Sequence, residues 1–233
     1  ETQQFPFTPR TGNDLEMDKI AYAFRHFLDT IKTGDSPFFL FVNYITCHLP
    51  YTPEARFRNK HVRGFPPDPV FTLTSHNWLE RKDAGRLGEE EIGYLQKLYR
   101  AEVEQVDAAI GEIVALLKDR DAFENTLFVV TSDHGECIGH HGFFDHQFNL
   151  FDDLVKIPLV MHHPKLSKGR TVSVPVQLSD IFPTVLELFG LREERLRLKL
   201  PGMVIPLDPA REGRPPPGGR PLFFLYRKGS RVL

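Results

Sequence analysis

The strongest constraint on the fold is a stripe of apolar side chains that recurs at steps of three and four residues between positions 92 and 117. The stripe consists of Ile92, Leu95, Tyr99, Val103, Val106, Ile110, Ile113 and Leu117. This spacing places the side chains on one face of an α-helix, which must bury that face against other elements. The apolar segment TLFVVTSD (residues 126–133) follows almost at once and predicts a strand.

Further predicted helices and strands alternate along the chain. Ile20, Phe24, Phe27 and Ile31 predict an earlier helix, and the run PFFLFVNYIT (residues 37–46) predicts a strand buried on both faces, as in a parallel sheet. Later elements are a short helix at NLFDDLV (149–155), a strand at IPLVMH (157–162) and a helix at IFPTVLELFG (181–190) that Ser179 or Asp180 can cap. Residues 50–88 have no period and five prolines, which indicates a functional loop or short helices. This order favours the α/β class, with a mostly parallel sheet covered by helices on both faces.

Composition excludes several classes of function. The formal net charge is −2, so no global basic field exists to hold nucleic acid. No apolar run reaches the roughly 18 residues that would span a bilayer. Cys47 and Cys137 are the only cysteines, and neither lies in a CxxC motif, so a disulfide framework is not expected. The cellular compartment stays undetermined, because two such cysteines are compatible with a reducing compartment without requiring one.

The loop after the strand at 126–133 contains the first group of residues that can support chemistry. Asp133 and His134 stand side by side at the strand end, where a carboxylate oxygen and an imidazole nitrogen can reach one cation. Gly135 lets the backbone turn sharply, and His140, His141 and His146 follow in the same loop. The competing interpretation is an ordinary turn in which the aspartate caps the next segment.

The loop after the strand at 37–46 contains the second group. His48 can donate a hydrogen bond to an anionic substrate oxygen or move a proton, although a single histidine in such a position is more often structural. Cys47 lacks the surroundings of a reactive cysteine and is interpreted as a small buried residue.

Four segments in this order resemble the sulfatase family. PFFLFVNYITCHLPYTP resembles the family's apolar strand and PHxPY loop, and the segment from LYRAEVEQVD to TSDHGECIGHHG resembles its long helix, strand and TSDHGE…GEHG loop. FDHQFNLFDDLVKIPLVMHHP and VQLSDIFPTVLELFGL are similar to the family's LYE…RVPLI segment and DIxPTLLxLAG helix.

The resemblance implies membership of the alkaline phosphatase superfamily, a three-layer α/β/α core and hydrolysis of sulfate esters. It implies one divalent cation, typically Ca²⁺ with Mg²⁺ or Mn²⁺ as alternatives, and a formylglycine nucleophile made within a C/S-x-P-S-R motif. Asp133 and His134 match the paired metal ligands, whereas His48 and His146 match the residues that bind the sulfate and assist the leaving oxygen. By the same matching, His141 shapes the loop and Lys156 is structural.

The sequence also departs from the family pattern. It contains no C/S-x-P-S-R motif and no early strand with paired aspartates. We therefore expect a chain without the amino-terminal third of the family's domain, and the chain alone to be inactive. Residues 1–207 are interpreted as a partial catalytic domain, and residues 208–233 as a linker and the start of a small β subdomain.

Two alternatives to a sulfatase stay open at this point. An enzyme of the same superfamily that acts on phosphorus, such as a phosphodiesterase, a phosphonate monoester hydrolase or a headgroup transferase, would share the metal and histidine positions. A non-catalytic binding domain is the other alternative. The substrate and the oligomeric state cannot be read from these residues.

Overall fold

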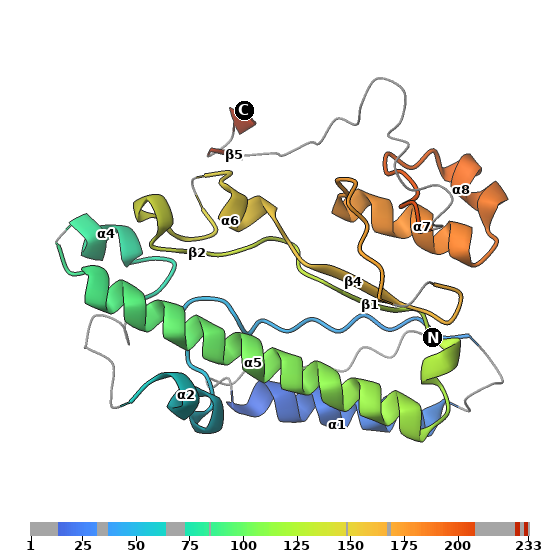
Figure 1. Ribbon diagram of the computed structural model, residues 1–233, viewed down its shortest axis with the longest axis horizontal. Coiled ribbons are helices and arrows are strands. Elements are labelled where there is room, and N and C mark those ends of the chain that lie inside the picture. The colour runs from blue at the N-terminus through green and yellow to red at the C-terminus, as the bar shows by residue number, and fades with distance from the viewer. Residues whose placement is uncertain are drawn as a thin grey trace. The chain divides into compact units, whose positions relative to one another are not determined.

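The computed structural model describes residues 14–31, 37–63, 73–83, 85–147, 149–166, 169–207, 227–228 and 231–232 (Figure 1). The chain forms two compact units, which we describe one at a time. The first contains the described residues up to Phe123 together with Glu136–Gln147, and the second contains Glu124–Gly135 and the described residues from 149 onward.

The main helix of the first unit, α5 (Glu89–Asp119), confirms the predicted long helix. It contacts α1 (Asp14–Thr30) and α2 (Ala55–His61). The apolar residues from Ile20 to Ile31 predicted α1. Ion pairs from Arg25 to Glu112 and from Arg120 to Asp29 join α1 to α5.

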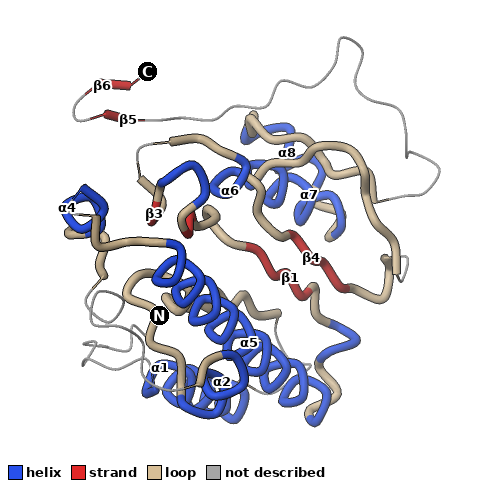
Figure 2. Tube along the Cα trace, turned by 60° about the vertical axis from the view of Figure 1, so that its left-hand side comes forward, coloured by secondary structure: helices blue, strands red, loops and turns tan. Residues whose placement is uncertain are grey.

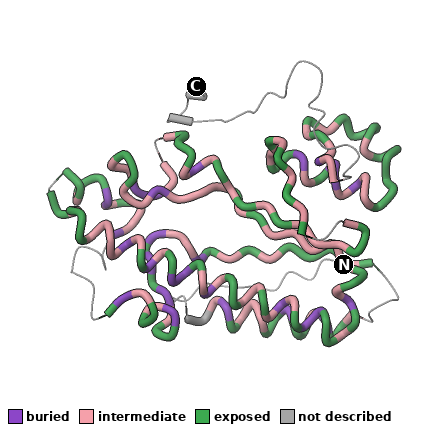
Figure 3. Tube along the Cα trace, viewed as in Figure 1, coloured by how far each residue is buried: buried purple, intermediate pink, exposed green. Residues whose placement is uncertain are grey.

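The buried face of α5 differs from the predicted apolar stripe. Val103 belongs to the stripe but is 45% exposed, whereas Glu102 and Gln105 are 0% and 1% exposed. Figure 3 shows buried, intermediate and exposed positions interspersed along α5. The helix has therefore turned a carboxylate and an amide inward, and buried groups of this kind require hydrogen-bond partners.

The apolar core of the first unit lies beside these polar groups. The described residues of segment 50–88 include two short helices, α2 and α4 (Trp78–Asp83). β2 (Cys137–Ile138) and β3 (Phe144–Asp145) form an antiparallel hairpin. The core consists of Leu49, Tyr51, Val62, Leu73, Trp78, Leu95, Leu98 and Phe144. It thus joins the loop after residue 46 to the hairpin that precedes residue 146.

The predicted strand at residues 37–46 is extended but pairs with no strand in the described part of the chain. One face is partly covered, with the Phe38 ring 5.7 Å from that of Phe27 in α1. The other face leaves Phe39, Phe41 and Ile45 exposed by 89%, 77% and 65%. Burial of this segment on both faces was therefore a wrong prediction for the described chain, because no neighbouring layer covers the second face.

In the second unit, β1 (Phe128–Thr131) pairs with β4 (Leu159–His162), and the two strands lie side by side in Figure 2. Both lie where the sequence predicted strands. The pairing is antiparallel, with Thr131 opposite Leu159, so a parallel arrangement is wrong for this pair. A parallel neighbour requires a crossover, usually a full helix. The helix described in this connection, α6 (Asp152–Val155), has only four residues.

The helix α7 (Ile181–Leu188) confirms the predicted helix after Asp180. The Asp180 carboxylate is buried and accepts hydrogen bonds from the backbone N–H groups of Gln177 (2.6 Å) and Met203 (2.8 Å). The Thr184 hydroxyl donates to the Asp180 carbonyl (2.6 Å) and accepts from the Ile205 N–H (2.9 Å). These contacts fasten the segment around residue 204 to the start of α7.

The remaining elements are short. The helix α8 (Arg192–Leu198), which the sequence did not predict, follows α7. β5 (Arg227–Lys228) and β6 (Arg231–Val232) form an antiparallel pair, and the predicted linker at 208–221 lies outside the described residues. Among the described helices, none combines the length and apolar character that crossing a membrane requires.

Candidate active site

The loop that carries His48 is held by the buried carboxylate of Glu102 on α5. Glu102 Oε2 accepts a hydrogen bond from the Cys47 N–H (2.9 Å), and Oε1 accepts one from the Thr52 N–H (2.6 Å). These two N–H groups flank His48, so one side chain fixes both ends of its loop. Hydrogen bonds to an ionised acceptor are the stronger kind, which makes Glu102 a firm anchor.

Cys47 within this loop is not set up as a nucleophile. Burial, together with the nearby carboxylates of Glu102 and Glu136, raises the pKa of its thiol to about 12. The reactive form of a cysteine is the thiolate, which is almost absent at neutral pH under these conditions.

His146 follows the β2–β3 hairpin and lies against Asp145, which sequence reasoning missed. Asp145 is 0% exposed and has a left-handed backbone, with φ of 67°. Its Oδ1 accepts the His146 N–H (2.8 Å) and lies 2.5 Å from His146 Nδ1, while Oδ2 accepts from Gln147 Nε2 (3.1 Å). A carboxylate in this position can orient the imidazole.

The structure brings His48 and His146 together, although 98 positions separate them (146 − 48). Their ring centroids are 5.0 Å apart at an interplanar angle of 60°. The reason is the shared core, because Leu49 next to His48 and Phe144 close to His146 both belong to it. His48 Nδ1 lies 2.7 Å from the Leu49 carbonyl oxygen, which assigns the Nδ1 proton to that contact and leaves Nε2 to interact with a ligand.

Glu136 adds a second buried carboxyl group next to His146. Its side chain is 4% exposed, and its Oε2 lies 3.8 Å from His146 Nδ1. Burial and the neighbouring charge of Asp145 raise the pKa of Glu136 to about 8, and the hydrogen bond that Tyr51 donates to Oε1 (3.1 Å) opposes this shift. At neutral pH the carboxyl group is therefore mostly protonated, which limits the negative charge beside the two histidines.

Asp133 and His134 belong to the second unit and follow β1 directly. Asp133 Oδ2 lies 3.7 Å from His134 Nε2, and the two side chains are 86% and 38% exposed. One ion can contact both atoms at this separation, so the pair fits part of a cation site. Calcium takes six to eight oxygen ligands, so the pair supplies only part of such a site.

Position 135 has room only for a glycine. A Cβ at this position would lie 1.9 Å from the Asp153 carbonyl oxygen, far inside contact distance. The Gly135 N–H also donates to the Leu154 carbonyl at 2.8 Å. The glycine thus lets the Asp133–His134 turn pack against the backbone at the start of α6.

The other residues named from the family resemblance lie at the surface. His141 is exposed, and its φ of 53° places it in the left-handed region of the turn. The Lys156 side chain is 76% exposed and forms an ion pair with Asp152 at 2.5 Å.

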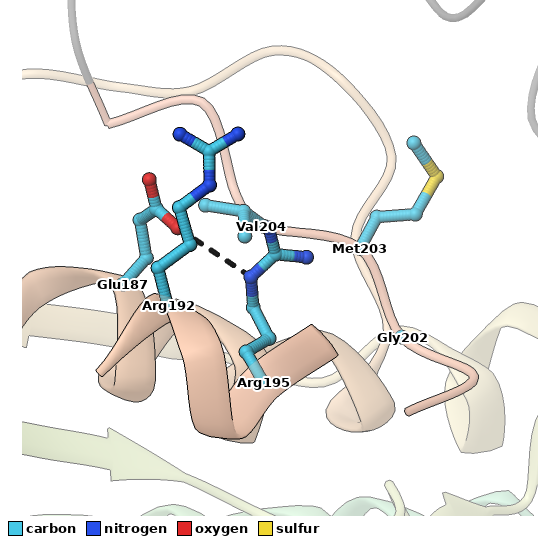
Figure 4. A pocket seen from close by; sticks show the side chains of 6 residues that line it. All are labelled: Glu187, Arg192, Arg195, Gly202, Met203 and Val204. Atoms are coloured by element: carbon cyan, nitrogen blue, oxygen red, sulfur yellow. Dashed lines mark ion pairs between the residues drawn. The ribbon is translucent and has the colours of Figure 1, made fainter. Parts of the chain in front are cut away.

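A cavity of about 430 Å³ in the second unit contains none of the predicted site residues (Figure 4). It is lined by Glu187, Arg192, Arg195, Gly202, Met203 and Val204. Arg195 Nε lies 3.4 Å from Glu187 Oε2, so part of the positive charge in this cavity is already neutralised.

Comparison with known proteins places the chain in a family. The sulfatase family model matches residues 4–191. An arylsulfatase K from Danio rerio is 32% identical over 157 residues, which covers 67% of this chain and 28% of the relative. An iduronate 2-sulfatase from Mus musculus is 29% identical over 67% of this chain and 31% of its own length.

A solved phosphonate monoester hydrolase from Agrobacterium radiobacter superposes with a TM-score of 0.64 at 22% identity, covering 91% of this chain and 45% of that structure. This likeness shows the alkaline-phosphatase-like fold. The chain spans less than a third of the length of both curated relatives. The family model, by contrast, matches most of the chain, and on that ground the chain belongs to the sulfatase family.

Proposed function

We propose that this chain is part of a sulfuric ester hydrolase that cleaves a sulfate monoester with the help of a divalent metal ion. The observation that carries the proposal is the juxtaposition of His48 and His146, with ring centroids 5.0 Å apart and Asp145 against the second ring. Two imidazole rings that come together from distant parts of the chain can bind one anion through two hydrogen bonds. Membership of the sulfatase family supports sulfate as that anion.

In this proposal, His48 and His146 each donate a hydrogen bond from a protonated ring to a sulfate oxygen. Asp145 stabilises the imidazolium of His146 through its contact with Nδ1. His146 then gives a proton to the ester oxygen as the S–O bond to the alcohol breaks, and the departing alcohol leaves neutral. His48 holds the sulfate in place, and Glu102 fixes the loop on which His48 depends.

Asp133 and His134 would hold the divalent cation, most simply Ca²⁺ with Mg²⁺ and Mn²⁺ as alternatives, which supplies positive charge where the transition state becomes more negative. Formylglycine would supply the attacking oxygen. No C/S-x-P-S-R motif occurs in these 233 residues, so the proposal requires that this group comes from outside them.

The same proposal includes the complete architecture. We infer a three-layer α/β/α domain with a mostly parallel central sheet, to which residues 1–207 contribute a part. Residues 208–233 would form a linker and the start of a small β subdomain.

A phosphonate or phosphate ester hydrolase is the second candidate. The likeness to a phosphonate monoester hydrolase, at a TM-score of 0.64, favours it over a non-catalytic binding domain. The histidines would have the same contacts with a phosphorus oxyanion. Only the rates of cleavage of the two kinds of ester can therefore distinguish the two candidates.

The test is turnover by the intact protein, with calcium present, of matched aryl sulfates and aryl phosphonates whose phenol leaving groups differ in pKa. We expect sulfate cleavage, and we expect His146→Ala to slow esters of poor leaving groups by about 10²–10⁴-fold and those of good ones less. His140→Ala, which changes an exposed histidine of the same loop, serves as the control. Faster cleavage of phosphonates moves the assignment to the second candidate, and equal losses across the series remove the proton-donor role from His146.

A further inference from the structure

His48, Asp145 and His146 also have the composition of a transition-metal site. One ligand atom from each residue lies within 4.8 Å of the corresponding atoms of the other two, and Asp145 is fully buried. Two imidazole nitrogens and one carboxylate oxygen are ligands that zinc accepts, whereas calcium prefers oxygen alone. This group therefore differs in chemical type from the Asp133–His134 pair.

His48 carries the outer contact that metal-binding histidines usually show. A ligand histidine donates its second ring N–H to a backbone carbonyl or carboxylate, which fixes the tautomer and aims the other nitrogen at the metal. His48 Nδ1 has this contact with the Leu49 carbonyl oxygen at 2.7 Å. Its Nε2 is thereby prepared as the ligand atom. Glu102 in turn fixes the backbone on both sides of His48.

The charge beside His146 also favours a cation. The Asp145 carboxylate lies 2.5 Å from its Nδ1. When both rings are neutral, this carboxylate faces no positive charge from the two histidines. A buried carboxylate is costly unless it is paired or bound to a metal.

We propose that His48, Asp145 and His146 bind one divalent transition-metal ion of the zinc class, and that this ion and the substrate anion exclude each other. A ring nitrogen whose lone pair binds a metal cannot carry a proton, and so it cannot donate a hydrogen bond to the substrate anion. Zinc is then an inhibitor that acts at the catalytic histidines. The metal binding stands on the geometry alone, whereas the exclusion of substrate rests on the proposed function.

The required rearrangement is small. Ligand atoms around a tetrahedral zinc ion lie roughly 3.3 Å apart, given Zn–N and Zn–O distances of about 2.0–2.2 Å. If Asp145 Oδ1 and His146 Nδ1 are ligand atoms, this pair, now 2.5 Å apart, must open, while atoms up to 4.8 Å apart must approach. Shifts of about an ångström, which side-chain rotation can supply, are sufficient.

The first experiment measures binding of zinc chloride to the purified full chain by calorimetry in buffer that contains excess calcium. Absorption of bound Co²⁺ reports the ligand geometry. We expect one tight zinc site per chain, and we expect His48→Gln and His146→Gln each to weaken it at least tenfold. Asp145→Asn tests the charge, because asparagine tolerates the left-handed backbone.

The matched control is His140→Gln, which changes an exposed histidine of the same loop. Circular dichroism of each metal-free variant separates a lost ligand from a lost fold. Zinc affinity that is unchanged in both His48→Gln and His146→Gln, or that falls equally in His140→Gln, overturns the proposal.

The second experiment measures aryl sulfate turnover by the intact protein at increasing zinc concentration. Inhibition that substrate relieves, at zinc concentrations matching the calorimetric Kd, is the expected result. Tight zinc binding without any esterase activity contradicts the proposed function and leaves the metal site in place. Turnover that saturating zinc does not change contradicts the mutual exclusion.

Discussion

Replacement of Glu102 by glutamine tests whether one buried carboxylate holds the His48 loop. Both carboxylate oxygens accept backbone N–H groups, from Cys47 at 2.9 Å and Thr52 at 2.6 Å, and the residue is 0% exposed. Glutamine keeps one acceptor oxygen but turns an NH₂ group towards the other N–H. The variant loses a charge-assisted hydrogen bond and leaves a buried donor without an acceptor, which together lower the free energy of unfolding by about 2–4 kcal/mol.

The assay is urea unfolding followed by tryptophan fluorescence. Trp78 is the sole tryptophan and belongs to the same core as Leu49 and Tyr51, so its emission reports the unit that contains the loop. With a urea slope of about 2 kcal/mol per molar, the midpoint should fall by about 1–2 M.

The control is Glu104→Gln, two residues further along α5, where the carboxylate is 41% exposed and pairs with Lys60 and His61 at the surface. This variant should unfold close to wild type, because exposed ion pairs contribute little. If Glu102→Gln also unfolds within error of wild type, the two backbone N–H groups do not depend on this carboxylate and the reasoning is wrong.

Three further outcomes follow from single side chains. Thr184→Val keeps the volume but removes a fully buried hydroxyl that bridges two backbone groups, so stability should fall by about 1–3 kcal/mol in a thermal or urea melt, whereas Thr184→Ser should lose much less. Equal losses in the two variants would show that the hydroxyl is not the reason. Gly135→Ala should be strongly destabilising because its Cβ would meet the Asp153 carbonyl at 1.9 Å, whereas Gly111→Ala, in a helix with open space around it, should raise the melting temperature. An unaffected Gly135→Ala would contradict the close approach. Cys47 should not react with iodoacetamide at pH 8, where a pKa of about 12 leaves roughly one thiol in ten thousand ionised, and it should react once the protein is unfolded in urea. Rapid alkylation of the native protein would contradict that pKa.

The helices and strands were predictable wherever a local period defined them. The stripe from Ile92 to Leu117 gave α5 because helical spacing is a property of neighbouring residues. The same stripe misplaced Val103 and missed Glu102, because the partners of Glu102 lie 50 and 55 positions away in a loop. A polar residue at a buried helix position is recognisable only when its distant partner is known.

Some residues of the candidate site could be predicted from the sequence, whereas others could not. Asp133, His134, His48 and His146 stood out because each follows a predicted strand or lies in a family motif. Asp145, in contrast, looked like any turn residue, and its left-handed backbone and complete burial depend on the core that Phe144 joins. The direction of strand pairing was also beyond reach, because apolar content indicates a buried strand without indicating which neighbour it meets.

The extended segment 37–45 has a consequence for deuterium labelling. Its backbone is stretched like a strand, yet in the described part of the chain it has no ladder partner, so its amide protons are not shielded as those of α5 are. The amides from residue 38 to residue 44 should exchange early, while those in the middle of α5 retain hydrogen much longer. Deuterium uptake by this segment therefore measures whether another strand pairs with its backbone, alongside the exposed rings of Phe39 and Phe41.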